Sequence, residues 1–195
     1  MHRFLLRIFI VSLLFLAACN SPFSSKYKGY ASISFPSKSY QTFNEQGYPY
    51  TFEFPTYAQI DKNVNYFGVS KKTDSWINIH FSSLGATIYV SYSKMKPNQL
   101  DTLIKDAYSF ANNHNSKASS IADSLFSNAH GVEGVFFHIG GDVATSYQFF
   151  ITDSTTHFFR GALYFDTTPN EDSLAPVNDF LYKDLKHLVN TFRWK

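Results

Sequence analysis

The residue with the most distinctive chemistry is Cys19, the only cysteine in this chain of 195 residues. It ends the small-residue run Leu16-Ala17-Ala18-Cys19, which follows a short basic start and the apolar stretch Ile8–Leu16. This order is typical of a secretory signal, and the apolar stretch is too short for a bilayer span of about 20 residues. A cysteine at the cleavage position is the lipoprotein pattern. We therefore predict cleavage before Cys19 and acylation of its thiol, with palmitate among the chains.

The lipid would hold the mature protein at a membrane, since several acyl chains on one residue make anchoring stable. The alternative is an ordinary secreted protein with a cysteine there by chance. The predicted organisation is a signal peptide over residues 1–18, a lipidated cysteine and serine-rich tether over 19–29, and a single globular domain over 30–195.

Histidine, serine and glycine residues that could support catalysis are present, but they do not form a known catalytic or metal-binding sequence motif. None of the seven histidines stands at HExxH or another paired ligand spacing, and GxSxG, GxGxxG and GxxxxGK[ST] are all absent. His138 and Asp142 flank Gly140-Gly141, which suggests either an acid–base pair or a strand histidine beside a turn aspartate. We expect a protein that is not an enzyme, with no cofactor and no metal, although a metal site assembled from distant positions stays open.

Arg160 stands in the middle of a segment that is otherwise apolar. A buried guanidinium needs a partner, and Asp153 or Asp166 could supply a carboxylate. A structural ion pair and a contact with a ligand or protein partner are both compatible with this position.

A second candidate surface is the outward face of an expected hairpin, which would carry Trp76, Asn78, His80 and Tyr89. Tryptophan and tyrosine among polar neighbours are typical of protein interfaces. The competing interpretation is that the helix expected between Pro97 and His114 covers this face. Together with Arg160, these four residues form the predicted partner-binding set.

Alternation of apolar and polar residues predicts the strands that would position these side chains. A short link containing Gly85 joins two of the runs and predicts the hairpin. The run His157–Phe165 is apolar on both faces, so we expect cover on both sides of the sheet. The predicted strands are Tyr48–Phe54, Trp76–Phe81, Ala86–Tyr92, Gly134–Ile139, Tyr147–Thr152 and His157–Phe165.

Two segments show helical periodicity instead. One follows Pro97 and carries Leu100, Leu103, Ile104, Ala107 and Ala111. The other runs from Val177 to Phe192, with Pro176 expected near its start. The predicted fold class is α+β, with a mainly antiparallel sheet of about six or seven strands flanked by two long helices. Such an α-β-α sandwich resembles the Mog1/PsbP-like architecture, a likeness that carries no function.

Charge excludes two classes of partner. Without residues 1–18 the formal charge of +2 falls to zero, because two arginines are removed with the signal. A neutral chain has no electrostatic footprint for nucleic acid and lacks the clustered cations of an anionic-lipid binder.

Four segments resemble the gliding-motility lipoprotein GldD family: YPYTFEFPTYA (48–58), WINIHFSSLGATIYVSY (76–92), IGGDVATSYQFFITDSTTHFFRGALYF (139–165) and PNEDSLAPVNDFLYKDLKHLVNTFRWK (169–195). With the lipobox they span nearly the whole chain, and residues 94–132 match only loosely. The resemblance implies a role in bacterial gliding and the associated type 9 secretion machinery. The family has no established catalytic residues, so only lipidated Cys19 carries over with a role.

Two functions are therefore expected. The first is a membrane-anchored, non-enzymatic component that binds other proteins of the gliding and secretion apparatus. The second is an envelope enzyme or small-ligand binder with a pocket at the sheet edge. The tether carries no acidic cluster after Cys19, which favours the periplasmic face of the outer membrane, with the inner membrane left open.

Overall fold

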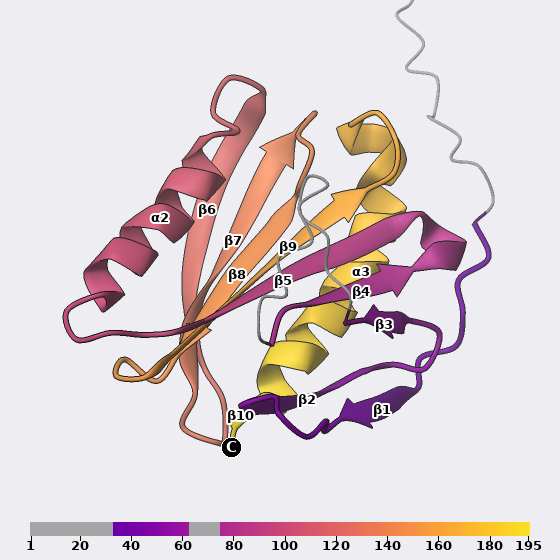
Figure 1. Cartoon of the computed structure of the whole chain (residues 1–195). Helices are drawn as coiled ribbons and strands as arrows, with labels where there is room; N and C mark the ends of the chain where they lie inside the picture. Colours follow the sequence, from indigo (N-terminus) through magenta and orange to yellow (C-terminus); the bar gives the residue numbers. More distant parts are fainter. Residues whose placement is uncertain (1–32, 63–74) are drawn as a thin grey trace, which may run out of the picture. The chain divides into compact units, whose positions relative to one another are not determined.

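The computed structural model describes residues 33–62 and 75–195 (Figure 1). Cys19, the signal segment and the tether lie outside the described residues. A compact unit spans Ser34–Lys195, and no helix among the described residues is long and apolar enough to cross a membrane. The elements are β1 (Tyr40–Phe43), β2 (Tyr50–Pro55), β3 (Gln59–Asp61), β4 (Ile77–Phe81), the 3-10 turn η1 (Ser82–Leu84), β5 (Ala86–Lys94), α2 (Leu100–Asn112), β6 (Ala118–Ser127), β7 (Glu133–Gly141), β8 (Tyr147–Thr152), β9 (His157–Phe165), α3 (Glu171–Thr191) and β10 (Arg193–Trp194).

The main sheet has seven strands in the order β3-β4-β5-β9-β8-β7-β6, and all its pairs are antiparallel (Figure 1). The predicted hairpin is β4–β5, where Ile79 lies opposite Ile88. Gly85 adopts a left-handed conformation at φ 57° that permits the tight link. The expectation of a mainly antiparallel sheet with two long helices is confirmed.

Each face of the sheet carries its own apolar layer. On one face α2 packs over the middle strands, and the buried cluster there consists of Met95, Ala107, Ala111, Val135, Phe137, Ile139, Val143, Phe150 and Phe158. On the other face the rings of Tyr50 and Phe192 each lie 4.9 Å from the ring of Phe159. Phe158 and Phe159 are neighbours buried on opposite faces, which confirms the expectation that β9 is covered on both sides.

Helix α3 begins earlier than its sequence pattern indicated. Asn170 caps it by accepting a hydrogen bond from the Ser173 N–H at 2.9 Å. Pro176 therefore lies inside the helix rather than near its start, which corrects that prediction. The buried apolar stripe of α3 contains Val177, Leu181, Leu185, Leu188 and Val189.

A second sheet, with the order β1-β2-β10, was not expected. Strand β10 directly follows α3, and Trp194 pairs with Tyr50. Helix α3 also packs against β2. This small sheet joins the start and the end of the described chain beside α3.

Candidate functional site

The structure places the predicted partner-binding residues on one face of the main sheet. Asn78 of β4 lies opposite Tyr89 of β5, and Ser91 of β5 lies opposite Arg160 of β9. This is the face that α2 partly covers, since Arg160 lies between Phe158 and Ala162 along β9. Two alternatives were expected for this face: a bound partner, or cover by the helix. Helix α2 lies beside the hairpin residues and leaves them partly exposed, so it covers the face only in part.

Local contacts fix the hairpin side chains. The indole Nε1–H of Trp76 donates to the Tyr92 carbonyl at 2.7 Å, and His80 Nδ1 lies 3.0 Å from Thr87 Oγ1. The Tyr89 ring meets the Tyr164 ring edge-on at 5.6 Å. Asn78 Oδ1 is buried and accepts no hydrogen bond from the described residues. These contacts hold the aromatic rings in defined positions at the surface.

A groove of about 450 Å³ runs between this face and α2. We call it the hairpin groove. Its aromatic lining is Trp76, Phe110, Phe158 and Tyr164, and its polar and small lining is Ser91, Ser93, Asp106, Ala107, Asn113, His114 and Arg160, with Leu103 on the helix. Of its aromatic rings, Phe110 is the most open, with 46% of the residue exposed.

Two contacts of Arg160 involve groups that sequence reasoning did not name. Its Nη2 donates to the Gln148 side-chain oxygen at 2.7 Å, and its guanidinium lies 4.4 Å from the centroid of the Phe110 ring. Asp153, considered as a carboxylate partner of Arg160, closes the β8–β9 turn by accepting backbone N–H groups. Burial raises the pKa of Asp153, but these backbone donors outweigh it and hold the pKa below its usual range.

His138 and Asp142 have separate partners. The ring of His138 stacks on Tyr147 with centroids 5.0 Å apart. Asp142 accepts a hydrogen bond from the Glu171 N–H at 2.8 Å, at the start of α3. Within the described part of the chain no group of three or more histidine, aspartate or glutamate side chains could hold a metal ion.

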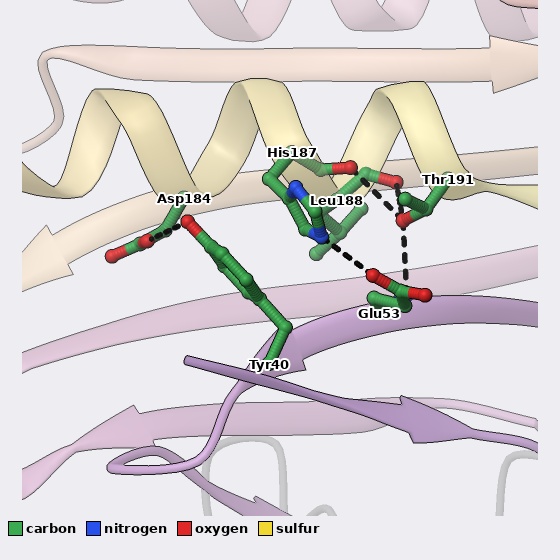
Figure 2. Close-up of polar contacts among 6 residues, drawn as sticks. All are labelled: Tyr40, Glu53, Asp184, His187, Leu188 and Thr191. Carbon is green, nitrogen blue, oxygen red and sulfur yellow. Dashed lines mark hydrogen bonds and ion pairs between the residues drawn. The ribbon is translucent and has the colours of Figure 1, made fainter. Parts of the chain in front are cut away.

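The titratable cluster that sequence reasoning missed is centred on Asp184 of α3 (Figure 2). Only 2% of this residue is exposed. Its carboxylate accepts hydrogen bonds from the Tyr40 and Tyr57 hydroxyls, the former at 2.9 Å, and lies 2.7 Å from Lys38 Nζ. Asp184 falls three residues after Leu181 and four before Leu188, so its place on the apolar stripe of α3 was a readable sign of burial.

A second polar contact lies one turn further along α3. His187 Nε2 is 2.7 Å from Glu53 Oε2, and the imidazole stacks on the Tyr40 ring. Thr191 Oγ1 accepts from the Glu53 N–H at 3.0 Å. Figure 2 marks this contact by a dashed line between the two residues. The contacts of Asp184, His187 and Thr191 join α3 to β1 and β2. We call this set of contacts the clamp, and its role is structural.

Burial and the Asp184 carboxylate shift the pKa values of the side chains that contact Asp184. Burial comes first among the causes that raise the pKa of Tyr40 to about 12, followed by its hydrogen bond to Asp184 and the charge of that carboxylate. The same causes raise the pKa of Tyr57. Burial lowers the pKa of Lys38, against the opposing effect of Asp184. Both phenols are therefore neutral donors at neutral pH.

These shifts predict an alkaline loss of stability. Unfolded tyrosines ionise near pH 10, whereas folded Tyr40 and Tyr57 keep their protons to higher pH. The folded state then binds more protons, so the stabilisation contributed by these two phenols is fully present below about pH 10 and is lost as pH rises to about 12 and beyond. Lys38 acts in the opposite sense, only below its ordinary pKa of 10.5. The Tyr57→Phe variant should show a shallower alkaline decline in urea-unfolding free energy, and an unchanged slope would contradict this assignment.

Comparison with known proteins gives one family match. A family model described as "Gliding motility lipoprotein GldD" matches residues 20–194. Among curated proteins, none matches the chain. Among solved structures, the solution structure of cyanobacterial PsbP (CyanoP) from Synechocystis sp. PCC 6803 is similar at 13% identity and a TM-score of 0.44, covering 85% of this chain and 98% of that one.

Proposed function

Because this chain belongs to the gliding motility lipoprotein family GldD, we propose that it is a non-enzymatic component of the gliding apparatus and the associated type 9 secretion machinery. It binds other proteins of that apparatus while lipid on Cys19 holds it at the membrane. The observation that carries the binding role is the hairpin groove, which exposed Phe110, half-buried Arg160 and Trp76 line together.

The composition of this groove fits a protein partner. Aromatic residues and arginine are the side chains that most often dominate binding energy at protein interfaces. Phe110 is 46% exposed on a helix whose neighbouring Ala107 and Ala111 are buried. The partner we propose inserts an apolar side chain between Phe110 and Trp76.

The contacts of the acid–base side chains support the non-enzymatic role. Asp184 is buried beneath Lys38 and two tyrosines, and Asp142 and Asp153 accept backbone hydrogen bonds. Each of these carboxylates stabilises a helix, a turn or the clamp between α3 and β1–β2. A general base needs room for a substrate within hydrogen-bond reach, and buried Asp184 has none.

The membrane we propose is the outer membrane, with the domain on its periplasmic side. This rests on the tether after Cys19, whose nine residues NSPFSSKYK contain no acidic side chain. Their extended reach is roughly 30 Å, so the domain works close to the lipid surface.

The experiment replaces groove residues in gliding cells and measures both movement and partner capture. Trp76→Ala and Phe110→Ala should each weaken partner binding by about 30-fold, since such anchors contribute about 2 kcal/mol. Gliding should stop while the protein remains in the membrane fraction. Phe110→Ala is the cleaner variant, because Trp76 also makes a hydrogen bond to Tyr92.

Lys105→Ala is the matched control, since Lys105 is an exposed residue of α2 outside the groove. It should glide normally. Normal gliding of folded Phe110→Ala would remove the groove from the proposal. Lost gliding with partner crosslinking unchanged would instead favour the small-ligand function, for which a groove of about 450 Å³ is large enough.

A further inference from the structure

Strand β6 forms one edge of the main sheet and is unusually long for an edge. It has ten residues, and its neighbour in the sheet order is β7 alone (Figure 1). Strands average about five or six residues, and edges are normally protected by proline, lysine or short length. The sequence ASSIADSLFS of β6 contains neither proline nor lysine. Its register irregularity lies at the start, between Ala118 and Ser120, so the remainder runs regularly.

The backbone direction along β6 can be deduced from its end. The Asn128 N–H donates towards β7, to the Val132 carbonyl at 3.0 Å. Backbone groups alternate in direction along an antiparallel strand. The N–H and C=O groups of Ile121, Asp123, Leu125 and Ser127 therefore point to the outer edge, where the described residues provide no further strand.

The same residues carry their side chains on the α2 side of the sheet. Leu125 lies opposite Val135, which is part of the cluster under α2. Asp123 accepts a hydrogen bond from the Tyr108 hydroxyl of α2 at 3.1 Å. Ile121 packs against that cluster as well. The residues whose backbone groups point to the outer edge are therefore the same residues whose side chains face α2.

An apolar hollow of about 520 Å³ adjoins this edge. Ile104 and Tyr108 of α2 form one wall, and Val135 and Phe150 form its floor. Leu125 lies on its rim with 85% of the residue exposed. The only charged residue in the lining is Glu133, and β6 itself carries only Asp123.

We propose that β6 binds an extended segment of another protein, which adds an antiparallel strand to the sheet. The segment presents apolar side chains opposite Leu125 and Ile121, and a basic side chain opposite Asp123. The apolar residue opposite Leu125 fills the hollow against Ile104. This is strand addition, in which the backbone supplies affinity and alternate side chains supply selectivity. It is independent of the hairpin groove, which lies on the other side of α2.

A second copy of this chain fits the edge less well. The register that would pair all four outward residues of β6 with the same four in another copy places Asp123 opposite Leu125. A shift of the register that pairs Ile121 with Leu125 sets the two Asp123 carboxylates against each other. Like charges directly opposite are unfavourable in a sheet. A shift in the other direction avoids this, but it pairs only three of the four outward residues and sets Asp123 opposite Ser127. A basic residue from another protein gives Asp123 an opposite charge in the full register.

The test uses the mature chain carrying Cys19→Ser and two synthetic peptides. Both are capped heptapeptides in which valine, lysine and valine alternate with threonine. The first peptide is N-methylated on its valines and lysine, whose N–H groups would face β6. The second peptide is N-methylated on its inner threonines, whose N–H groups would face away from β6. The first should bind about tenfold or more weaker than the second. Binding of the second should slow hydrogen exchange at Ile121, Asp123 and Leu125.

Leu125→Pro removes one outward N–H and the exposed side chain without breaking the β6–β7 pairing. It should abolish binding, while Phe110→Ala leaves it unchanged. Leu125→Lys is the second variant if Leu125→Pro fails to fold. Equal binding of the two peptides, no binding at millimolar peptide, or self-association that Leu125→Lys removes would each overturn the proposal.

Discussion

Replacing Asp184 with alanine is expected to lower the free energy of unfolding by about 2 kcal/mol or more, because it removes the buried charged acceptor of two tyrosine hydroxyls. Lys38 is an exposed residue, so water can solvate its ammonium group in the variant. Lys38 also donates to the Phe180 carbonyl at 2.9 Å and lies 3.5 Å from the centre of the Phe180 ring. Its remaining contacts limit the loss without replacing the carboxylate.

Two matched variants identify the source of this effect. Asp184→Asn keeps an acceptor for the tyrosines and removes only the charge, so it should cost less than Asp184→Ala. Asp179→Ala changes an exposed aspartate of the same helix and should stay within about 0.5 kcal/mol of the wild type. Urea unfolding of the mature chain gives all three values. A loss below about 1 kcal/mol for Asp184→Ala would show that the clamp is dispensable.

The second large effect is expected for Cys19→Ser, which should move the protein from the membrane fraction to the soluble fraction. Serine has no thiol for acylation, and each buried CH₂ of an acyl chain contributes about 0.8 kcal/mol to membrane binding. Loss of several chains removes essentially all of the anchoring. Ultracentrifugation of cell lysates and the mass of the mature N-terminus measure the outcome.

Ser21→Ala is the control for this change, because it alters the tether and leaves the thiol in place. It should remain in the membrane fraction with an acylated Cys19. An unmodified cysteine at the mature N-terminus, or cleavage at another position, would refute the lipidation prediction. Retention of Cys19→Ser in membranes would indicate that a protein contact holds the domain there.

Combining these variants separates anchoring from binding. Cys19→Ser should abolish gliding by removing the domain from its site of action, with the domain still folded. Asp184→Ala should act through the amount of folded protein, and Phe110→Ala through contact with the partner alone. Melting temperature, membrane fraction and partner capture therefore distinguish the three causes of a gliding defect.

The sequence alone determined the strands and helices whose patterns are local. Alternation predicted the buried residues of β4, such as Ile77 and Ile79, and the glycine link identified the β4–β5 hairpin. Leu181, Leu185 and Leu188 marked the buried stripe of α3. Each of these signals depends on neighbours within a few residues, because one buried face imposes its period on the chain.

Strand β6 was missed because it lacks the continuous buried face that produces such a period. An edge strand with solvent on much of its surface has no buried face to impose alternation, and the polar run ASSIADSLFS shows none. Strands β1, β3 and β10 are short, and their pairing joins distant residues, as when Trp194 pairs with Tyr50. Local patterns carry no information about such partners.

The tertiary structure also decided which polar residues matter. Sequence reasoning placed Trp76, Asn78, His80 and Tyr89 on one face, because strand periodicity fixes that relation. It could not place α2, whose position leaves the hairpin groove on one side and the hollow beside Leu125 on the other. For Arg160 it considered a carboxylate, a ligand or a protein partner, and it did not anticipate the contacts with Gln148 and Phe110. Asp184 meets Lys38 and Tyr40 only after α3 and β1 pack together, because that contact spans more than 140 residues.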